Sequence, residues 1–368
     1  MMLTQELGNQ MELGIKKAKH ELLILFNLSL DLNNPILSFT HDWVIEFSKH
    51  FEQVIVFSTH TGQFSLPKNV SVLEIGGGSF FKRLRALMIL LKAVAIAMKI
   101  KKCVVFHHMS TKTLVFPGLI FKLMRIRQGA WYSHSHADLY LRISSKFSYK
   151  YFTASESSFP LDSCFSRVTV IGHGIDYDHA LSLEQIGDSS RNRDSLLFVG
   201  RISRIKRIEN AISALSVLDS SIRSLDLLGP ITDAEYMTEL LELAKVSGIN
   251  IKFLGEMSRE QAQKTMNKYE YLFSDTPKST DKSALEAAGN GIFVVSTNRE
   301  TLSLCGVLKV YREARNPSVL NSLSEQLKLL RAKSEESIRG DRIEIARITR
   351  SQNSLKSTIW KIVNEITQ

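Results

Sequence analysis

The sequence has few cysteines and no long apolar run. Its three cysteines, Cys103, Cys164 and Cys305, lie far apart without a CxxC spacing. This argues against a zinc ribbon or a disulfide framework and fits a reducing compartment. No apolar run has the length needed to span a bilayer, and the first residues lack the basic-then-apolar order of a signal peptide. We therefore expect a cytoplasmic protein.

Acidic residues are missing from one long interval. Between Glu74 and Asp138 there is none, although the net charge of the whole chain is only +10. Such a basic patch could attract nucleic acid, an anionic membrane or a phosphorylated substrate, or it could be a solvated face. No nucleic-acid-binding motif accompanies it, so we expect no nucleic-acid partner. The cations of the interval are Lys82, Arg83, Arg85, Lys92, Lys99, Lys101, Lys102, Lys112, Lys122, Arg125 and Arg127.

What the sequence does contain is alternation of strands and helices over 368 residues, 44% of them hydrophobic. Strand-length apolar runs alternate with longer segments of helical period, which predicts doubly wound α/β units with parallel sheets. A polar stretch without periodicity interrupts the pattern, and the length favours two domains. We predict a first domain over residues 1–176, a connection over 177–194 and a second domain over 195–352. An amphipathic helix over 353–368 is expected to pack back on the first.

Two cations follow a strand in "LLFVGRISRIK". The strand ends at Gly200, and Arg201 and Lys206 then precede a helix. A helix N-terminus carries a partial positive charge and free N–H groups, so with two cations it suits a diphosphate. The alternative is an ordinary solvated surface.

The stretch "SDTPKSTDKSALEAAGNGIFVVST" has the same strand-to-helix arrangement. Ser279, Thr280 or Asp281 can cap a helix that begins near Lys282. Glu286 then lies about one turn inside that helix, where a carboxylate can accept hydrogen bonds from paired hydroxyls, as acidic residues do for ribose. A plain surface glutamate is the alternative.

Histidines end two predicted strands of the first domain. His107 and His108 close "CVVFHHM", and His134 lies just after "GAWY". A histidine at a strand end could bind the transferring sugar or orient an acceptor hydroxyl. No carboxylate or thiol joins them in sequence, so a metal site is not expected. The D-x-D triplet 176–178 lies at the domain junction, and we interpret it as part of the crossover.

"GRISRIK", "LLG", "IKFLG" and "DKSALEAAGNGIFVVSTN", in this order, resemble the C-terminal domain of retaining glycosyltransferase family 4. The resemblance implies the GT-B fold, two facing Rossmann-like domains with a cleft between them. It implies that Arg201 and Lys206 bind the donor diphosphate and that Glu286 binds the ribose. We also expect Thr280 and Lys282, in the same stretch as Glu286, to contact the donor. It places the family's histidine at His108 or His107, with His134 as a second choice.

One position departs from the family pattern. The first glutamate of the family's E-x7-E motif, held to contact the donor sugar, would fall at position 278, which is Lys278. The nearest acid is Asp281. The donor-sugar contact could therefore be made by Asp281, by Lys278 or by neither.

The resemblance implies transfer of a hexosyl group from a nucleotide-diphosphate sugar to a hydroxyl, with retention and without a metal or other cofactor. The expected acceptor is a saccharide or a lipid-linked oligosaccharide of surface polysaccharide synthesis, such as lipopolysaccharide, O-antigen or capsule. The basic, apolar segment 80–102 suits the inner face of an anionic membrane. The alternatives are a GT-B nucleotide-sugar epimerase and a catalytically inactive partner subunit.

Overall fold

The structure is a computed structural model with two compact units, residues 1–174 with 355–368 and residues 175–354. The segment 177–194, expected as a connection, lies within the second unit. Most of the basic segment 80–102, and Lys278, lie outside the described residues. The structure describes residues 20–34, 37–76, 88, 91–92, 94–95, 102–134, 136–146, 149–161, 166–218, 222–277, 279–312 and 317–368.

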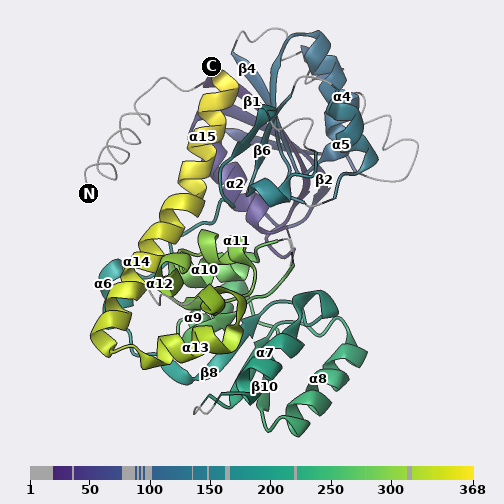
Figure 1. Cartoon of the computed structure of the whole chain (residues 1–368). Coiled ribbons are helices and arrows are strands. Elements are labelled where there is room, and N and C mark those ends of the chain that lie inside the picture. Colours follow the sequence, from purple (N-terminus) through teal and green to yellow (C-terminus); the bar gives the residue numbers. More distant parts are fainter. Residues whose placement is uncertain are drawn as a thin grey trace. The chain divides into compact units, whose positions relative to one another are not determined.

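The first unit is a parallel sheet with helices on both faces (Figure 1). Its strand order is β3-β2-β1-β4-β5-β6-β7. Its elements are β1 (His20–Leu30), α2 (Phe39–Ser48), β2 (Phe51–Thr61), β3 (Val70–Glu74), β4 (Cys103–His108), α4 (Thr111–Leu123), β5 (Arg127–Trp131), α5 (Leu139–Ser144), β6 (Lys150–Thr153), η1 (Glu156–Ser158), β7 (Val168–Val170) and α15 (Leu355–Thr367).

Alternation along the strands explains why both faces of this sheet are covered. Leu23 and Leu25 of β1 pack with Trp43 of α2 and with the apolar face of α15. Leu22 and Ile24, which point to the other face, pack in a separate cluster that includes Phe121 of α4. The helix expected over 353–368 is thus α15, and it buries its apolar side in the first unit.

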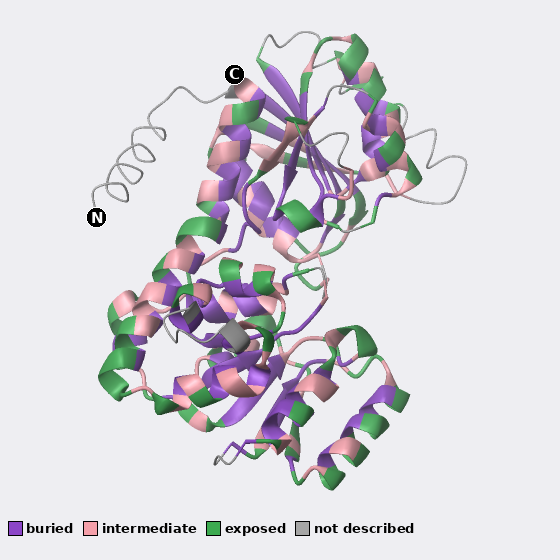
Figure 2. Ribbon diagram, in the orientation of Figure 1, coloured by how far each residue is buried: buried purple, intermediate pink, exposed green. Residues whose placement is uncertain are grey.

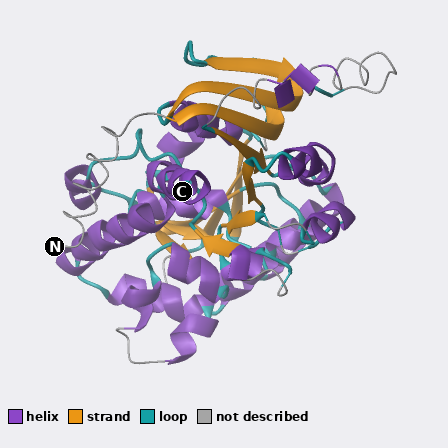
Figure 3. Cartoon of the chain, turned by 90° about the horizontal axis from the view of Figure 1, so that it is seen from above, coloured by secondary structure: helices purple, strands orange, loops and turns teal. Residues whose placement is uncertain are grey.

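The second unit repeats this plan with five parallel strands in the order β10-β9-β8-β11-β12. Helices, purple in Figure 3, alternate along the chain of this unit with strands, which are orange. Its elements are α6 (Leu183–Asp188), β8 (Asn192–Val199), η3 (Arg204–Lys206), α7 (Ile208–Ser216), β9 (Ser224–Leu228), α8 (Ala234–Val246), β10 (Asn250–Gly255), α9 (Arg259–Met266), β11 (Tyr269–Phe273), α10 (Lys282–Gly289), β12 (Phe293–Val295), α11 (Arg299–Leu304), α12 (Leu308–Arg312), η4 (Pro317–Asn321), α13 (Leu323–Ala332) and α14 (Glu335–Asn353).

The strand order of the second unit reverses direction between β8 and β11. In open parallel sheets such a switch point opens a crevice at the carboxyl ends of the strands, because the two connecting loops turn away from each other. The loops after β8 and β11 are those that the sequence singled out, so the fold brings the two motifs together.

Candidate functional site

Lys206 and Asp281 meet at the switch point of the second unit. Lys206 ends η3, just after β8, and Asp281 immediately precedes α10, just after β11. Their side chains form an ion pair and are only 13% and 17% exposed. Lys206 Nζ also donates to Thr276 Oγ1 at 3.2 Å. The lysine expected to bind a diphosphate is therefore held in place by neighbours on the adjacent strand end.

The carboxylate of Asp281 is committed to this network. Its Oδ2 accepts hydrogen bonds from Thr276 Oγ1 at 2.8 Å and Ser274 Oγ at 3.1 Å, while Oδ1 contacts Lys206. Asp281 is the N-cap residue of α10, but its side chain makes no capping hydrogen bond. Within the first turn, the N–H of Ala284 donates to the carbonyl oxygen of Asp281 at 3.1 Å. The N-terminus of a helix is also a favourable place for an anion, because the helix dipole is positive there.

Glycines let the strand-end loops lie close together. Gly229 has φ +136°, and a Cβ there would lie 2.2 Å from the carbonyl oxygen of Gly200. The N–H of Gly200 donates to Leu228 O at 2.9 Å, and that of Ile202 donates to Pro230 O at 2.9 Å. These bonds fix the start of the "GRISRIK" loop against the end of β9, so main-chain hydrogen bonds set the backbone position of Arg201 between them.

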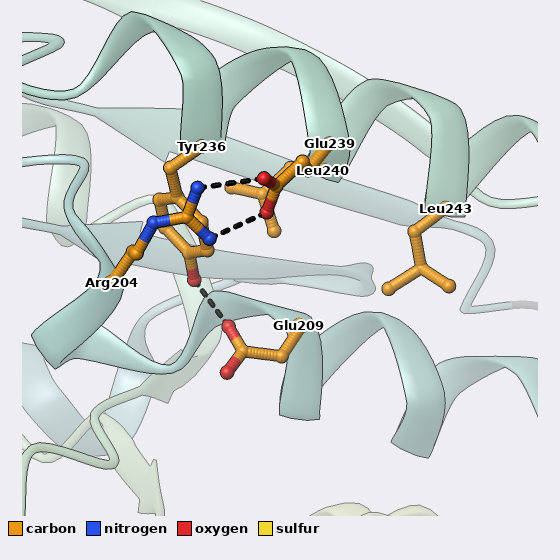
Figure 4. A pocket seen from close by; sticks show the side chains of 6 residues that line it. All are labelled: Arg204, Glu209, Tyr236, Glu239, Leu240 and Leu243. Carbon is orange, nitrogen blue, oxygen red and sulfur yellow. Dashed lines mark hydrogen bonds and ion pairs between the residues drawn. The ribbon is translucent and has the colours of Figure 1, made fainter.

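Arg201 and Arg204 of this loop have different environments. Arg201 is exposed, with no hydrogen bond or ion pair to any residue that the structure describes. Arg204 donates twice to Glu239, at 2.6 Å for each bond, and its guanidinium lies over the Tyr236 ring. These groups, with Glu209 and two leucines of α8, line a pocket of about 390 Å³ (Figure 4). The Arg204 side chain is thus held by Glu239 and Tyr236, whereas the Arg201 side chain remains available to a ligand.

Glu286 lies on α10, which begins at Lys282 as the capping pattern predicted. Its carboxylate pairs with Arg259 of α9 at 3.2 Å, and the two side chains are 22% and 49% exposed. An ion pair this exposed adds little stability, so hydroxyl groups of a ligand can replace it at low cost. Lys282 is half-buried at the first position of the helix.

Close packing explains the small residues around Glu286. A Cβ on Gly289 would lie 2.2 Å from the ring of Tyr177, whose hydroxyl donates to Leu285 O at 3.1 Å. Tyr177 is the middle residue of the D-x-D triplet, and Asp176 Oδ1 accepts from the N–H of Asp178 at 2.9 Å. The triplet therefore forms a turn packed against α10.

Sequence reasoning missed the buried Asp275, which joins three elements behind the site. Its carboxylate accepts from Thr297 N and Thr297 Oγ1, both at 2.7 Å, and from Asn210 Nδ2 of α7 at 2.9 Å. Thr280, expected to contact the donor, is buried with its hydroxyl 3.1 Å from that of Thr301. The polar run "SDT" at the end of β11 was the signal that could have indicated such a network.

His107 is enclosed in the core of the first unit. Its Nδ1 lies 2.9 Å from Thr113 Oγ1 and its Nε2 lies 3.2 Å from Gln128 Oε1, and its ring stacks on Phe26. Burial lowers the pKa of His107 from 6.5 to about 4. Its ring is therefore neutral near pH 7 and its nitrogens are occupied by protein groups.

His108 points to the opposite face of the same strand. Its ring packs against Trp43 with centroids 4.5 Å apart, and it is 2% exposed. The β1–β4 register pairs Phe26 with His107, so Asn27 and His108 lie side by side at this sheet's own switch point. Both amide atoms of Asn27 are buried without a hydrogen-bond partner among the described residues.

His134 follows β5 and is exposed, with its ring edge-to-face on Tyr132. Partial burial lowers the pKa of His134 below 6.5, and nearby Asp138 opposes this shift. The structure therefore gives three environments to the three histidines proposed from the sequence.

Within the described part of the chain, no helix is long and apolar enough to cross a membrane.

Two Rossmann-like units with parallel sheets define the GT-B fold, and the predicted fold class is confirmed. No family model and no curated protein sequence matches the chain.

The structural neighbours are GT-B glycosyltransferases. HepE of Anabaena, solved with UDP and glucose, has a TM-score of 0.66 at 15% identity, over 94% of this chain and 99% of that one. A glycosyltransferase of Rickettsia africae has a TM-score of 0.64 at 14% identity, over 94% and 98%. WaaG, a glycosyltransferase of lipopolysaccharide biosynthesis, has a TM-score of 0.52 at 16% identity, over 94% and 99%. At these identities the likeness establishes the fold.

Proposed function

We propose that the protein is a glycosyltransferase that moves a sugar from a nucleotide-diphosphate sugar to a hydroxyl acceptor. The observation that carries this proposal is the arrangement at the β8–β11 switch point. There the mostly buried Lys206, the exposed Arg201 and the first turn of α10 follow neighbouring strand ends. A diphosphate is the ligand whose charge and hydrogen-bonding capacity fit this combination.

The proposed reaction breaks the bond between the anomeric carbon and the diphosphate oxygen and forms one from that carbon to the acceptor oxygen. The acceptor proton passes to the departing diphosphate, which leaves on the face where the acceptor arrives, so the configuration is retained. Arg201 and Lys206 stabilise the charge that develops on the leaving group. We propose that this step proceeds without a metal ion.

We assign Glu286 to the ribose hydroxyls of the donor. These hydroxyls would replace the ion pair that Glu286 forms with Arg259. The histidine contact stays proposed for the first unit, where His108 is buried and His134 is exposed. Both ring nitrogens of His107 contact protein groups. Asp281 is assigned to positioning Lys206. This leaves the donor-sugar contact to Lys278 or to backbone.

Two further proposals concern the acceptor and the location of the protein in the cell. We propose a saccharide or lipid-linked acceptor in lipopolysaccharide, O-antigen or capsule synthesis, at the cytoplasmic face of the membrane. The fold of WaaG, a lipopolysaccharide enzyme, supports this pathway class. A nucleotide-sugar epimerase would act without any acceptor, and an inactive subunit would bind donor without turnover.

A thermal-shift screen with nucleoside diphosphates and nucleotide sugars tests the proposal. We expect one nucleotide class to raise the melting temperature of the wild type, and Glu286→Ala to reduce that response. If no nucleotide stabilises the wild type, the site assignment is wrong. Product analysis with the stabilising donor then separates the activities, because only a transferase consumes it in proportion to added acceptor.

A further inference from the structure

Helices α4 and α5 of the first unit expose large apolar side chains to solvent. Phe116 is 65% exposed, Leu119 39% and Leu123 77%, and Leu139 at the start of α5 is 67% exposed. Along α4 the exposed positions 112, 116, 119 and 123 recur at the spacing of one helix face. The two helices pack together, with the rings of Phe116 and Tyr140 6.2 Å apart. Exposed positions of both helices are green in Figure 2.

This α4–α5 surface, defined by Lys112, Phe116, Leu119, Lys122, Leu123 and Leu139, is basic as well as apolar. The only acid in residues 111–146 is Asp138. Its carboxylate accepts from Leu141 N at 2.7 Å and from Thr111 Oγ1 at 2.6 Å. The exposed cations of this stretch are Lys112, Lys122, Arg125, Arg127, Arg142 and Lys146. The surface therefore presents cations and apolar groups without an exposed acid.

Three described residues that precede α4 in the sequence are also apolar. Val94 packs in the same cluster as Phe121, on the inner side of α4. Met88 and Leu91, in helical positions just before it, are 52% and 48% exposed. Met88 and Leu91 are thus two further exposed apolar side chains among the described residues that precede Val94 in the sequence.

We infer that the α4–α5 surface docks the protein onto an anionic lipid membrane. A surface of cations among aliphatic and aromatic groups matches the interfacial region, where apolar side chains enter between headgroups and lysines reach the phosphates. Nucleic acid would use the cations but would leave Leu119, Leu123 and Leu139 in water. The inference concerns a different set of residues from the donor site and does not depend on that assignment.

The chain offers a matched control for the test. Lys122-Leu123 ends α4, and Lys245-Val246 ends α8 of the second unit in the same way. Val246 is 87% exposed, so it is at least as accessible as Leu123. The two pairs have the same charge and similar apolar area, but only the first belongs to the proposed surface.

The experiment is flotation of the full chain with vesicles of phosphatidylcholine alone or of equal parts phosphatidylcholine and phosphatidylglycerol. We expect the wild type to bind the anionic vesicles and to be released by salt. Lys122→Gln should weaken binding about fivefold, since one lysine near such a surface contributes about that factor. Leu123→Ser should weaken vesicle binding by roughly the same factor. The variants Lys245→Gln and Val246→Ser should bind as the wild type does.

Equal weakening by the control pair would overturn the inference, as would wild-type binding that does not distinguish the two vesicles. If Lys122→Gln weakens binding to heparin and vesicles alike while Leu123→Ser changes neither, the surface binds polyanions and the lipid proposal fails. A nucleotide thermal shift on the same variants should be unchanged, so a failure here is distinguishable from a failure of the donor site. All four substituted residues are exposed, and a thermal melt checks that each variant is folded.

Discussion

Asp281→Asn should strengthen binding of a nucleoside diphosphate. The carboxylate contacts Lys206 and both side chains are mostly buried, so its charge acts in a medium of lower effective dielectric than water. A unit charge about 6 Å from another at an effective dielectric of about 40 costs about 1.4 kcal/mol, or tenfold in affinity. Asparagine removes this repulsion but keeps an acceptor for Thr276 and Ser274.

The effect should be larger for the free nucleoside diphosphate than for the nucleotide sugar. The free diphosphate carries an additional negative charge above the second phosphate pKa of about 6. Isothermal titration of both ligands near pH 7, repeated near pH 5, measures the difference, which should shrink at the lower pH. Unchanged or weaker diphosphate binding in Asp281→Asn would refute the argument, because the carboxylate would then lie outside the field of the ligand.

Three further predictions concern stability. Gly289→Ala forces a methyl group into the Tyr177 ring. We expect urea unfolding to show a loss of about 1–3 kcal/mol in the free energy of unfolding. A loss below that range would mean that the ring moves aside freely. Glu270→Gln removes the negative charge that pairs with the buried Arg342 guanidinium, which should cost about 3–5 kcal/mol in the same assay. A neutral result would contradict the burial of that pair. His107 has its pKa lowered to about 4, so between pH 6.5 and 4 the unfolded chain binds a proton that the folded chain excludes. Wild-type stability should therefore fall by about 3 kcal/mol as the pH drops through that window. His107→Phe should lose this dependence, and identical pH profiles of the two proteins would exclude the assignment.

The sequence predicted the elements whose pattern was undisturbed. The apolar runs that became β1, β4, β8 and β11 were found because buried parallel strands are continuously hydrophobic. The start of α10 at Lys282 was found because small polar residues precede it. Helix α14 was not predicted, since its buried side includes polar Arg342 and Thr349. Arg342 is buried because Glu270 of β11 pairs with it, and this partner lies far away in sequence.

Pairing between residues that lie far apart in the sequence also limited the prediction of the site. Arg201, Lys206 and Glu286 could be proposed because each lies at a fixed place relative to a strand end. The pairing of Lys206 with Asp281, the commitment of Arg204 to Glu239 and the enclosure of His107 depend on contacts between distant segments. Such contacts arise from strand order, which the local pattern does not encode. His107 and His108 are adjacent in sequence, and only the packed sheet shows which side chain lies on which face.

The most direct test of the central claim compares two arginines of one loop. Nucleoside diphosphate is titrated calorimetrically into the wild type, Arg201→Ala and Arg204→Ala. We predict that Arg201→Ala weakens binding roughly ten- to a hundredfold, the range for a charge-assisted hydrogen bond to phosphate. Arg204 is held by Glu239, so Arg204→Ala should retain near-wild-type affinity. Equal affinities for Arg201→Ala and the wild type, or a greater loss in Arg204→Ala, would contradict a diphosphate site at the β8–β11 switch point.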